Sequence, residues 1–203
     1  KNNGREYRRK GNPHKVQGHD FQGELGKATP FGIYDVDTNE GFVNVGINSD
    51  TAEFAVNSIR QWYLTMGSDR YPNAKRLMIT ADGGGSNGSR NHLFERELQK
   101  FATEFQLEVH VFHYPPGTSK WNKIEHRLFA QISRNWRGRP LETLEIIVNL
   151  IASTKTKTGP HVECKLDKNE YETGIKVSEE EMTGLNLLRR AWRGDWNYVI
   201  FPK

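Results

Sequence analysis

A short apolar run, Arg76–Ala81, constrains the fold of this chain more than any other stretch. Continuous apolar side chains over so few residues are typical of a strand that is buried inside a sheet. The run ends at Asp82, and the glycine-rich segment 83–88 that follows lets a backbone or a ligand approach closely. The sequence therefore predicts a central strand with an acidic side chain at its carboxyl end.

The order of the remaining elements indicates an α/β fold. Further strands are predicted at 16–21, 30–36, 41–47 and 107–112. Helices are predicted at 51–66, 92–105, 121–136 and 141–151, followed by a strand at 161–166 and a helix start at Ser178. Turn residues at 37–40 join the second and third strands into a hairpin. Three opening strands followed by alternating helices and strands predict one mixed five-stranded sheet flanked by helices.

Composition divides the chain into three parts. Residues 1–13 are polar and basic, and such an arm suits phosphate contacts but is equally compatible with a solvated tail. Residues 14–153 hold the predicted sheet and form the core. Residues 154–203 are a C-terminal extension, and we expect its aromatic tail to pack on the core. A chain of 203 residues is long enough for this arrangement.

Composition also excludes several classes of protein. The single cysteine, Cys164, rules out an internal disulfide and a zinc site made of several cysteines. The sequence has no apolar run near about 18 residues and no signal-peptide pattern, so we expect a soluble, cytoplasmic protein. The net charge of +4 is too small to identify a partner by itself. The sequence starts at Lys1 rather than at Met, so we expect part of a longer protein.

The stretch Pro115–Phe129 is typical of a rigid loop that enters a helix. At about 100° per residue, one face of that helix holds the apolar side chains Trp121, Leu128, Phe129, Ile132 and Trp136. The opposite face holds Lys123, Arg127 and Arg134. Glu125 falls within the apolar face, where a carboxylate needs a cation or hydrogen-bond partners. It either pairs with a basic neighbour at the rim of this face or belongs to a functional site.

Two further carboxylates can join Glu125 in one site. The first predicted strand delivers Asp20, and the fourth delivers Asp82. Three converging carboxylates repel one another unless divalent cations bind them, and hard oxygen ligands select Mg²⁺ or Mn²⁺. Two such ions about 4 Å apart can activate a water or a 3′-hydroxyl and stabilise the leaving oxygen in phosphodiester chemistry. More distant phosphates would then contact Lys120, Lys123, Arg127 and Arg134.

Four motifs carry a resemblance to a known family: residues 18–21, the hairpin 34–46, residues 80–87 and residues 115–126. In these motifs the chain resembles the catalytic core of DDE transposases and retroviral-type integrases, which have an RNase H-like fold. It is most similar to the Rhodopirellula-type transposases of bacterial insertion sequences. The resemblance implies an RNase H-like core over 14–153, with Asp20, Asp82 and Glu125 as the triad that binds two Mg²⁺ or Mn²⁺ ions.

The chain departs from the family pattern at two points. The spacing from Asp82 to Glu125 is longer than the commonest integrase spacing, which a longer loop before the helix would absorb. The DNA-binding helical region expected upstream is absent from the sequence, so the chain resembles a core or a truncated product.

The resemblance also implies a function and partners. It implies a metal-dependent transposase that cuts DNA at element ends and transfers the 3′-hydroxyl to target DNA. Its partner would be DNA, on which it would assemble as a homo-oligomer, in the bacterial cytoplasm with the nucleoid and away from membranes. Two alternatives stay open: an RNase H-like nuclease that does not join strands, and a catalytically silent DNA-binding remnant of a transposase.

Neighbouring residues compete for these roles. Asp35 also lies in a predicted strand and is the main alternative to Asp20 as the first carboxylate. Asn122, one turn before Glu125, either orients that carboxylate or caps the helix. His110 and His113 resemble a metal pair, but alternation along a strand places them on opposite faces, so we interpret both as structural.

Overall fold

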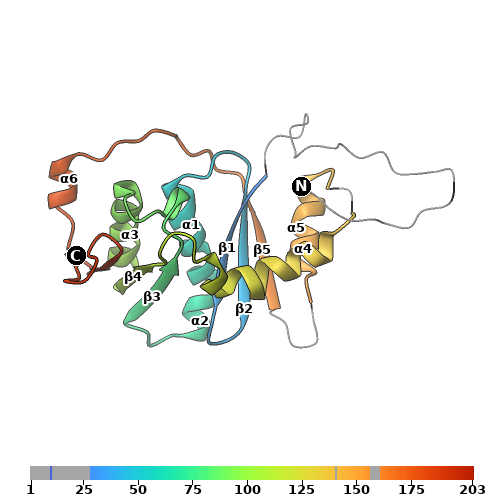
Figure 1. Ribbon diagram of the computed structural model, residues 1–203, viewed down its shortest axis with the longest axis horizontal. Coiled ribbons are helices and arrows are strands. Elements are labelled where there is room, and N and C mark those ends of the chain that lie inside the picture. Colours follow the sequence, from blue (N-terminus) through green and yellow to red (C-terminus); the bar gives the residue numbers. More distant parts are fainter. Residues whose placement is uncertain (1–9, 11–27, 140, 156–160) are drawn as a thin grey trace. The chain divides into compact units, whose positions relative to one another are not determined.

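The structure is a computed structural model that describes residues 10, 28–139, 141–155 and 161–203. The chain forms two compact units, shown as a ribbon in Figure 1. The first unit comprises residues 1–49 and 123–170, and the second comprises residues 50–122 and 171–203. In the described parts of the chain, no helix has the length and apolar character needed to cross a membrane. Most of the predicted basic arm, the strand predicted at 16–21 and Asp20 lie outside the described residues.

The first unit contains a three-stranded mixed sheet. Its strands are β1 (Thr29–Asp35), β2 (Glu40–Gly46) and β5 (His161–Asp167), in the order β1-β2-β5. β1 and β2 pair antiparallel, which confirms the predicted hairpin, and β5 pairs parallel to β2. The turn between β1 and β2 is held by Asp35, whose Oδ1 accepts hydrogen bonds from the backbone N–H groups of Asp37 and Thr38 at 3.0 and 3.3 Å. Asp35 therefore acts as a turn residue.

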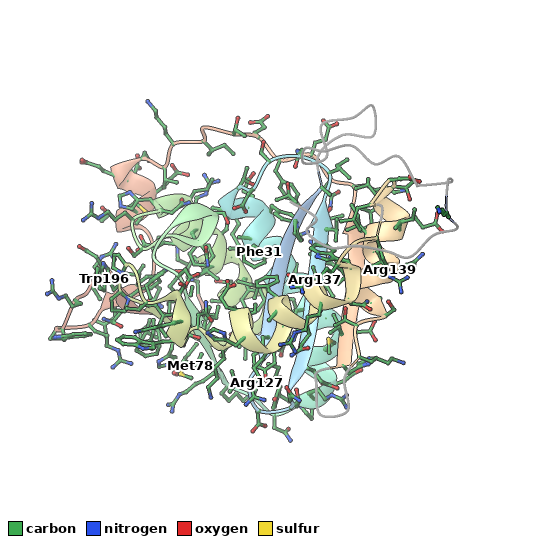
Figure 2. The ribbon with its side chains drawn as sticks, turned by 45° about the vertical axis from the view of Figure 1, so that its right-hand side comes forward. Phe31, Met78, Arg127, Arg137, Arg139 and Trp196 are labelled. Carbon is green, nitrogen blue, oxygen red and sulfur yellow. The ribbon has the colours of Figure 1, made fainter. Side chains whose placement is uncertain are left out.

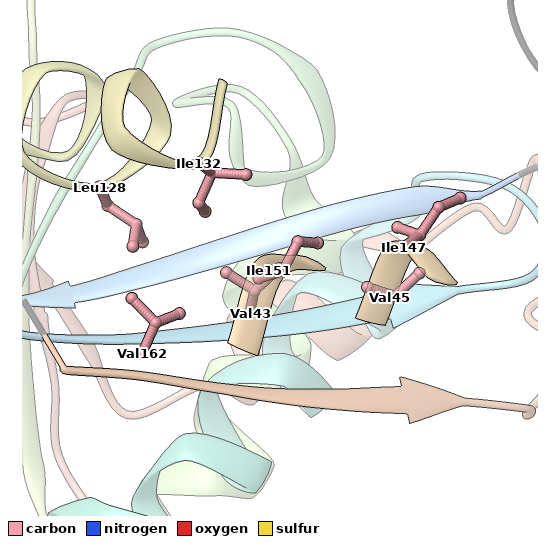
Figure 3. Close-up of a cluster of buried hydrophobic side chains, with 7 residues drawn as sticks. All are labelled: Val43, Val45, Leu128, Ile132, Ile147, Ile151 and Val162. Atoms are coloured by element: carbon pink, nitrogen blue, oxygen red, sulfur yellow. The ribbon is translucent and has the colours of Figure 1, made fainter. Parts of the chain in front are cut away.

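Helices pack on this sheet and form the hydrophobic core of the first unit. A helical segment from residue 123 to residue 136 includes the π-helix η4 (Glu125–Phe129) and α4 (Ala130–Trp136). The helix predicted at 141–151 is α5 (Leu144–Ala152), which begins later because the Thr143 hydroxyl caps it. Figure 3 shows the buried cluster that these helices form with β2 and β5: Val43, Val45, Leu128, Ile132, Ile147, Ile151 and Val162.

Two glycines let the helical segment approach the hairpin closely. A Cβ added at Gly41 would lie 2.6 Å from Leu128 Cδ1, and one added at Gly32 would lie 2.6 Å from Phe129 Cζ. Both distances are too short for real side-chain contacts, so a larger residue at either position would force the Leu128 or Phe129 side chain to shift. The glycines of β1 and β2 thus let η4, the element that begins at Glu125, pack closely on the hairpin.

The second unit contains a four-stranded mixed sheet in the order β3-β4-β7-β6. The strands are β3 (Arg76–Ala81), β4 (Glu108–His113), β6 (Leu187–Arg189) and β7 (Asn197–Ile200). β3 and β4 are parallel, whereas β7 pairs antiparallel with both β4 and β6. The C-terminal residues of the chain therefore supply two strands to this sheet, which the sequence analysis did not predict.

Helices of the second unit largely follow the sequence pattern. The longest are α1 (Ala52–Trp62) and α3 (His92–Phe105), and the shorter ones are η1 (Tyr63–Gly67), α2 (Ser68–Arg70), η2 (Gly85–Asn87), η3 (Ser119–Trp121) and α6 (Glu179–Thr183). The bounds of α3 and the helix start at Ser178 are confirmed. The predicted helix 51–66 is capped by Thr51 and continues through the π-turn η1 to Arg70.

Two predictions about exposed side chains were wrong. β3 was predicted to be buried on both faces, but among the described strands it lies at the sheet edge, and Met78 is 68% exposed. Trp121 was assigned to the apolar face of the helix, but it ends the 3₁₀ turn η3 and is 59% exposed. The chain becomes helical only at residue 123, so the periodicity assumed from Trp121 onward does not apply to Trp121 itself.

Candidate active site

Asp82 lies directly after β3, at the carboxyl end of that strand. The backbone N–H of Tyr114, which follows β4, donates to Ala81 O at 2.8 Å and ties the ends of the two parallel strands together. The Asp82 side chain is half-buried, and its Oδ1 accepts a hydrogen bond from Asn122 Nδ2 at 3.1 Å. The predicted site residues Asp82 and Asn122 thus meet within the second unit.

The glycine-rich loop after Asp82 is held by several contacts. Gly85 has a φ of +73°, a left-handed conformation that favours glycine, and its carbonyl accepts from Gly88 N at 3.2 Å. The two imidazole nitrogens of buried His113 lie 2.8 Å from Asn87 O and 3.2 Å from Trp196 O. His113 therefore links this loop to the C-terminal tail, whereas His110 lies beside Glu108, in keeping with the structural interpretation of both histidines.

Glu125 and three of the predicted DNA-binding residues belong to the first unit. Glu125 is half-buried at the start of η4, while Leu128 and Ile132 of the same helical segment are buried in the core. Lys123, Arg127 and Arg134 are exposed, as predicted from helical spacing; Arg127 is labelled in Figure 2. Lys120, in η3 of the second unit, is exposed as well.

The convergence of Asp20, Asp82 and Glu125 stays a prediction. Asp82 and Glu125 belong to different units, and Asp20 lies outside the described residues. Within the described parts, no group of three or more His, Cys, Asp or Glu side chains is arranged to hold a metal ion. The chemistry of Asp82 nevertheless suits Mg²⁺ or Mn²⁺, because it offers hard carboxylate oxygens that are partly accessible and oriented by an amide donor.

An ion pair between a buried carboxylate and an exposed arginine in the second unit was not found from the sequence. Glu95 of α3 is only 1% exposed, and Arg189 Nη2 lies 3.0 Å from its Oε1 and 3.1 Å from its Oε2. Burial raises the pKa of the Glu95 carboxyl, although Arg189 opposes the shift. Burial and the nearby Glu95 charge also raise the pKa of Tyr198 on β7. Glu95 directly follows Phe94 on the buried side of α3, and this position could have predicted a buried carboxylate. Its partner could not be predicted, because Arg189 lies 94 positions away in the sequence.

Comparison with known proteins gave one result. The family model described as "Rhodopirellula transposase DDE domain" matches residues 1–202. The match includes every predicted site residue: Asp20, Asp82, Lys120, Asn122, Lys123, Glu125, Arg127 and Arg134. Comparisons with curated proteins and with solved structures gave no match.

Proposed function

Since the chain belongs to the Rhodopirellula transposase DDE domain family, we propose that it is the catalytic core of a DNA transposase that cuts element ends and joins them to target DNA. Family membership supports a transposase function. The proposed cutting and joining of DNA rests mainly on Asp82. This residue follows a strand, accepts a hydrogen bond from an amide and precedes a glycine-rich loop that leaves room for a phosphate.

Asp20, Asp82 and Glu125 would hold two divalent cations, Mg²⁺ or Mn²⁺. When bound, these ions supply Lewis acidity to the attacking hydroxyl and to the leaving oxygen of the phosphodiester. Asn122 fixes the rotamer of Asp82 through its 3.1 Å hydrogen bond, so that the carboxylate is oriented before cation and DNA bind. Glu125 takes its position from η4, whose Leu128 and Phe129 side chains pack against Gly41 and Gly32 of the hairpin.

DNA phosphates would contact the exposed basic side chains Lys120, Lys123, Arg127 and Arg134. None of the four is a metal ligand, so their role is affinity and register rather than chemistry. Both element ends and target DNA must be held in one reaction, and we propose that the chain assembles into a homo-oligomer on DNA.

We also propose that residues 14–153 form an RNase H-like core with a five-stranded sheet, and that residues 1–13 are a basic arm that precedes it. This proposal is supported by the antiparallel β1–β2 hairpin and by the parallel pair β3–β4, which are elements of the predicted order. In this arrangement the strand predicted at 16–21 brings Asp20 to the site. The C-terminal part, 154–203, joins this core through the strands β5, β6 and β7.

A strand-joining assay tests the functional proposal. The chain is mixed with Mg²⁺, target DNA and a labelled duplex that carries the ends of the encoding element, and products are separated on a denaturing gel. We expect nicked ends and labelled joined strands with wild type, and neither with Asp82→Asn. Cutting without joining would indicate the nuclease alternative, and binding without cutting would indicate the silent remnant.

A further inference from the structure

A pocket of about 820 Å³ opens beside Asp82 in the second unit. Its walls come from the glycine-rich loop, the start of α3, Pro116, the segment Ile175–Val177 and Trp196. Gly83, the residue after Asp82, lines it directly. The pocket has the size of sites that hold small ligands or single ligand groups. None of the basic side chains already proposed to bind DNA is among the described residues that line it.

The charged side chains that line this pocket are all basic. Arg90, His92 and Lys176 are exposed at its wall, and none of its described lining residues is Asp or Glu. Acidic residues border the lining without being part of it: Asp82 precedes the glycine-rich loop, Asp195 precedes Trp196, and Asp50 Oδ2 lies 3.9 Å from a Cβ built at Gly85. A wall with two permanent positive charges beside an acidic catalytic candidate favours an anionic ligand.

Gly84 leaves its backbone accessible at the pocket wall. Its φ of −129° and ψ of 174° are ordinary extended values that any residue adopts. A Cβ added at Gly84 would meet no atom within 4 Å. Gly85, by contrast, has a φ of +73°, and a Cβ at Gly88 would lie 3.2 Å from Gly85 O. The backbone therefore favours glycine at 85 and is tight at 88, whereas at 84 neither conformation nor space calls for glycine, and its missing side chain leaves the pocket open.

Trp196 offers a flat apolar surface in the same wall (labelled in Figure 2). Its backbone is fixed on both sides, because Trp196 N donates to Arg193 O at 2.8 Å and Trp196 O accepts from His113 N at 2.9 Å. The Arg193 guanidinium lies 5.9 Å from the ring centroid, and the ring is half-buried. A partly exposed indole on a fixed backbone, next to basic side chains, is a combination that binds unpaired bases by stacking while cations hold the phosphates.

We propose that this pocket binds an unpaired nucleotide of the DNA strand that lies next to the scissile phosphate. Arg90, Lys176 and the backbone at Gly84 hold its phosphate, and Trp196 stacks on its base. This inference rests on the proposed transposase function and deepens it, because it assigns a single-strand contact to residues outside the predicted site.

The test measures binding of a fluorescein-labelled thymidine oligonucleotide by anisotropy, in EDTA so that metal ligands play no part. Arg90→Ala with Lys176→Ala should weaken binding and lower the salt slope by about 1 to 1.5, as expected for two lost phosphate contacts on a single strand. Trp196→Leu should weaken binding at least about fivefold and leave the salt slope unchanged, because stacking releases no counterions. Gly84→Ala should weaken binding without lowering the melting temperature.

The matched control is Lys75→Ala with Arg76→Ala, which removes two exposed charges from the opposite end of β3. If the Arg90 and Lys176 variant binds like this control, the pocket is not a phosphate site. If Trp196→Leu loses as much affinity for an abasic oligonucleotide as for the thymidine one, no base stacks on Trp196.

The strand-joining assay separates this inference from the proposed function. A wild type that cuts and joins DNA, together with pocket variants that bind like the control, would overturn only the pocket. Pocket variants that lose single-strand affinity in a protein that never cuts DNA would support the pocket and overturn only the catalytic proposal.

Discussion

The side-chain amide of Asn122 donates a hydrogen bond to the carboxylate of Asp82, with 3.1 Å between Nδ2 and Oδ1. The two residues are 40 positions apart in the sequence and come from the turn after η3 and from the end of β3. Asn122 is only 8% exposed, so water cannot readily replace it as the donor. The pair therefore orients the carboxylate that we propose as a metal ligand.

Replacing Asn122 by Ala should lower both stability and activity. Loss of a hydrogen bond to a charged, half-buried acceptor should reduce the free energy of unfolding by about 1 to 2 kcal/mol. DNA cleavage should fall further than stability explains, because Asp82 would adopt several rotamers. Urea unfolding and cleavage of a labelled DNA end check the two effects. Asn73→Ala, at an exposed position of the same unit, is the control and should change neither.

Divalent cations should stabilise the wild-type chain. A ligand that binds only the folded state adds about 2.7 kcal/mol at 100 times its dissociation constant, so millimolar Mg²⁺ or Mn²⁺ should raise the melting temperature. Glu125→Gln should reduce this increment and leave the metal-free protein equally stable or slightly more so, because one like charge is removed. Thermal scans with and without metal measure the difference. Glu170→Gln, exposed in the same unit, should respond like wild type; an equal response of Glu125→Gln would remove Glu125 from the site.

Close packing over Gly41 should appear as coupling between two core substitutions. Gly41→Ala alone should cost about 1 to 3 kcal/mol, since its Cβ would lie 2.6 Å from buried Leu128 Cδ1. Leu128→Ala alone should cost about 2 to 5 kcal/mol through the cavity that it leaves. The double variant should lose less than the sum, because the added methyl occupies that cavity. Combining Gly41→Ala with Ile147→Ala, at the other end of the cluster in Figure 3, should be additive.

The Glu95–Arg189 pair should make stability depend on pH. Burial raises the pKa of Glu95 above its ordinary 4.5, so the folded chain keeps a proton that the unfolded chain releases. The stability linked to that proton is present below about pH 4.5 and is lost as the pH rises through the raised pKa. The stability of wild type relative to Glu95→Gln should therefore decline from pH 4 toward neutrality. Urea unfolding at several pH values measures this decline.

The charges around Glu95 supply the control for this experiment. Arg189 lowers the Glu95 pKa most among its neighbours, with smaller effects from His92 on the same helix and His113 on β4. Arg189→Ala should thus move the decline to higher pH. Arg190→Ala removes an equal charge that lies beside His110 instead, and it should leave the decline where it is in wild type. A relative stability that does not change with pH would show that Glu95 keeps an ordinary pKa.

The sequence predicted those elements whose signal is local. α3 has the predicted bounds because its apolar spacing and its Asn91 cap both act within one helix, where Asn91 Oδ1 accepts from Phe94 N. The hairpin β1–β2 was predicted for the same reason, since turn residues and strand pattern are adjacent. β7 was missed because it is completed by partners far away in the sequence: Val111 of β4 pairs with Tyr198. All four residues of β7 are buried, but the charged and aromatic residues just before them gave no strand pattern in the sequence.

The candidate site likewise has a part that the sequence predicted and a part that depends on contacts between distant residues. Residue types and motif order gave Asp82 and Asn122, and the structure brings these two together. Helical periodicity relates Asn122 only to residues of the predicted helix 121–136, such as Glu125, and cannot reveal an acceptor 40 positions upstream. Pocket residues such as Lys176 and Trp196 were not predicted as site residues, because they lie in the C-terminal part, where no motif of metal ligands points to them.

DNA affinity and catalysis should separate on the exposed face of the helical segment 123–136. Lys123 and Arg127 are exposed there and carry no metal-ligand chemistry. Lys123→Ala with Arg127→Ala should weaken DNA binding and lower the salt slope by about 1 for each lost phosphate contact, yet retain cleavage at saturating DNA. Asp82→Asn should do the reverse, binding DNA nearly normally and cutting nothing. Salt-titrated anisotropy and cleavage of a labelled element end measure both, with Lys155→Ala plus Lys168→Ala, exposed in the same unit, as the matched control. If the Lys123 and Arg127 variant binds like that control, this helix face points away from DNA, and the phosphates must lie along another basic surface.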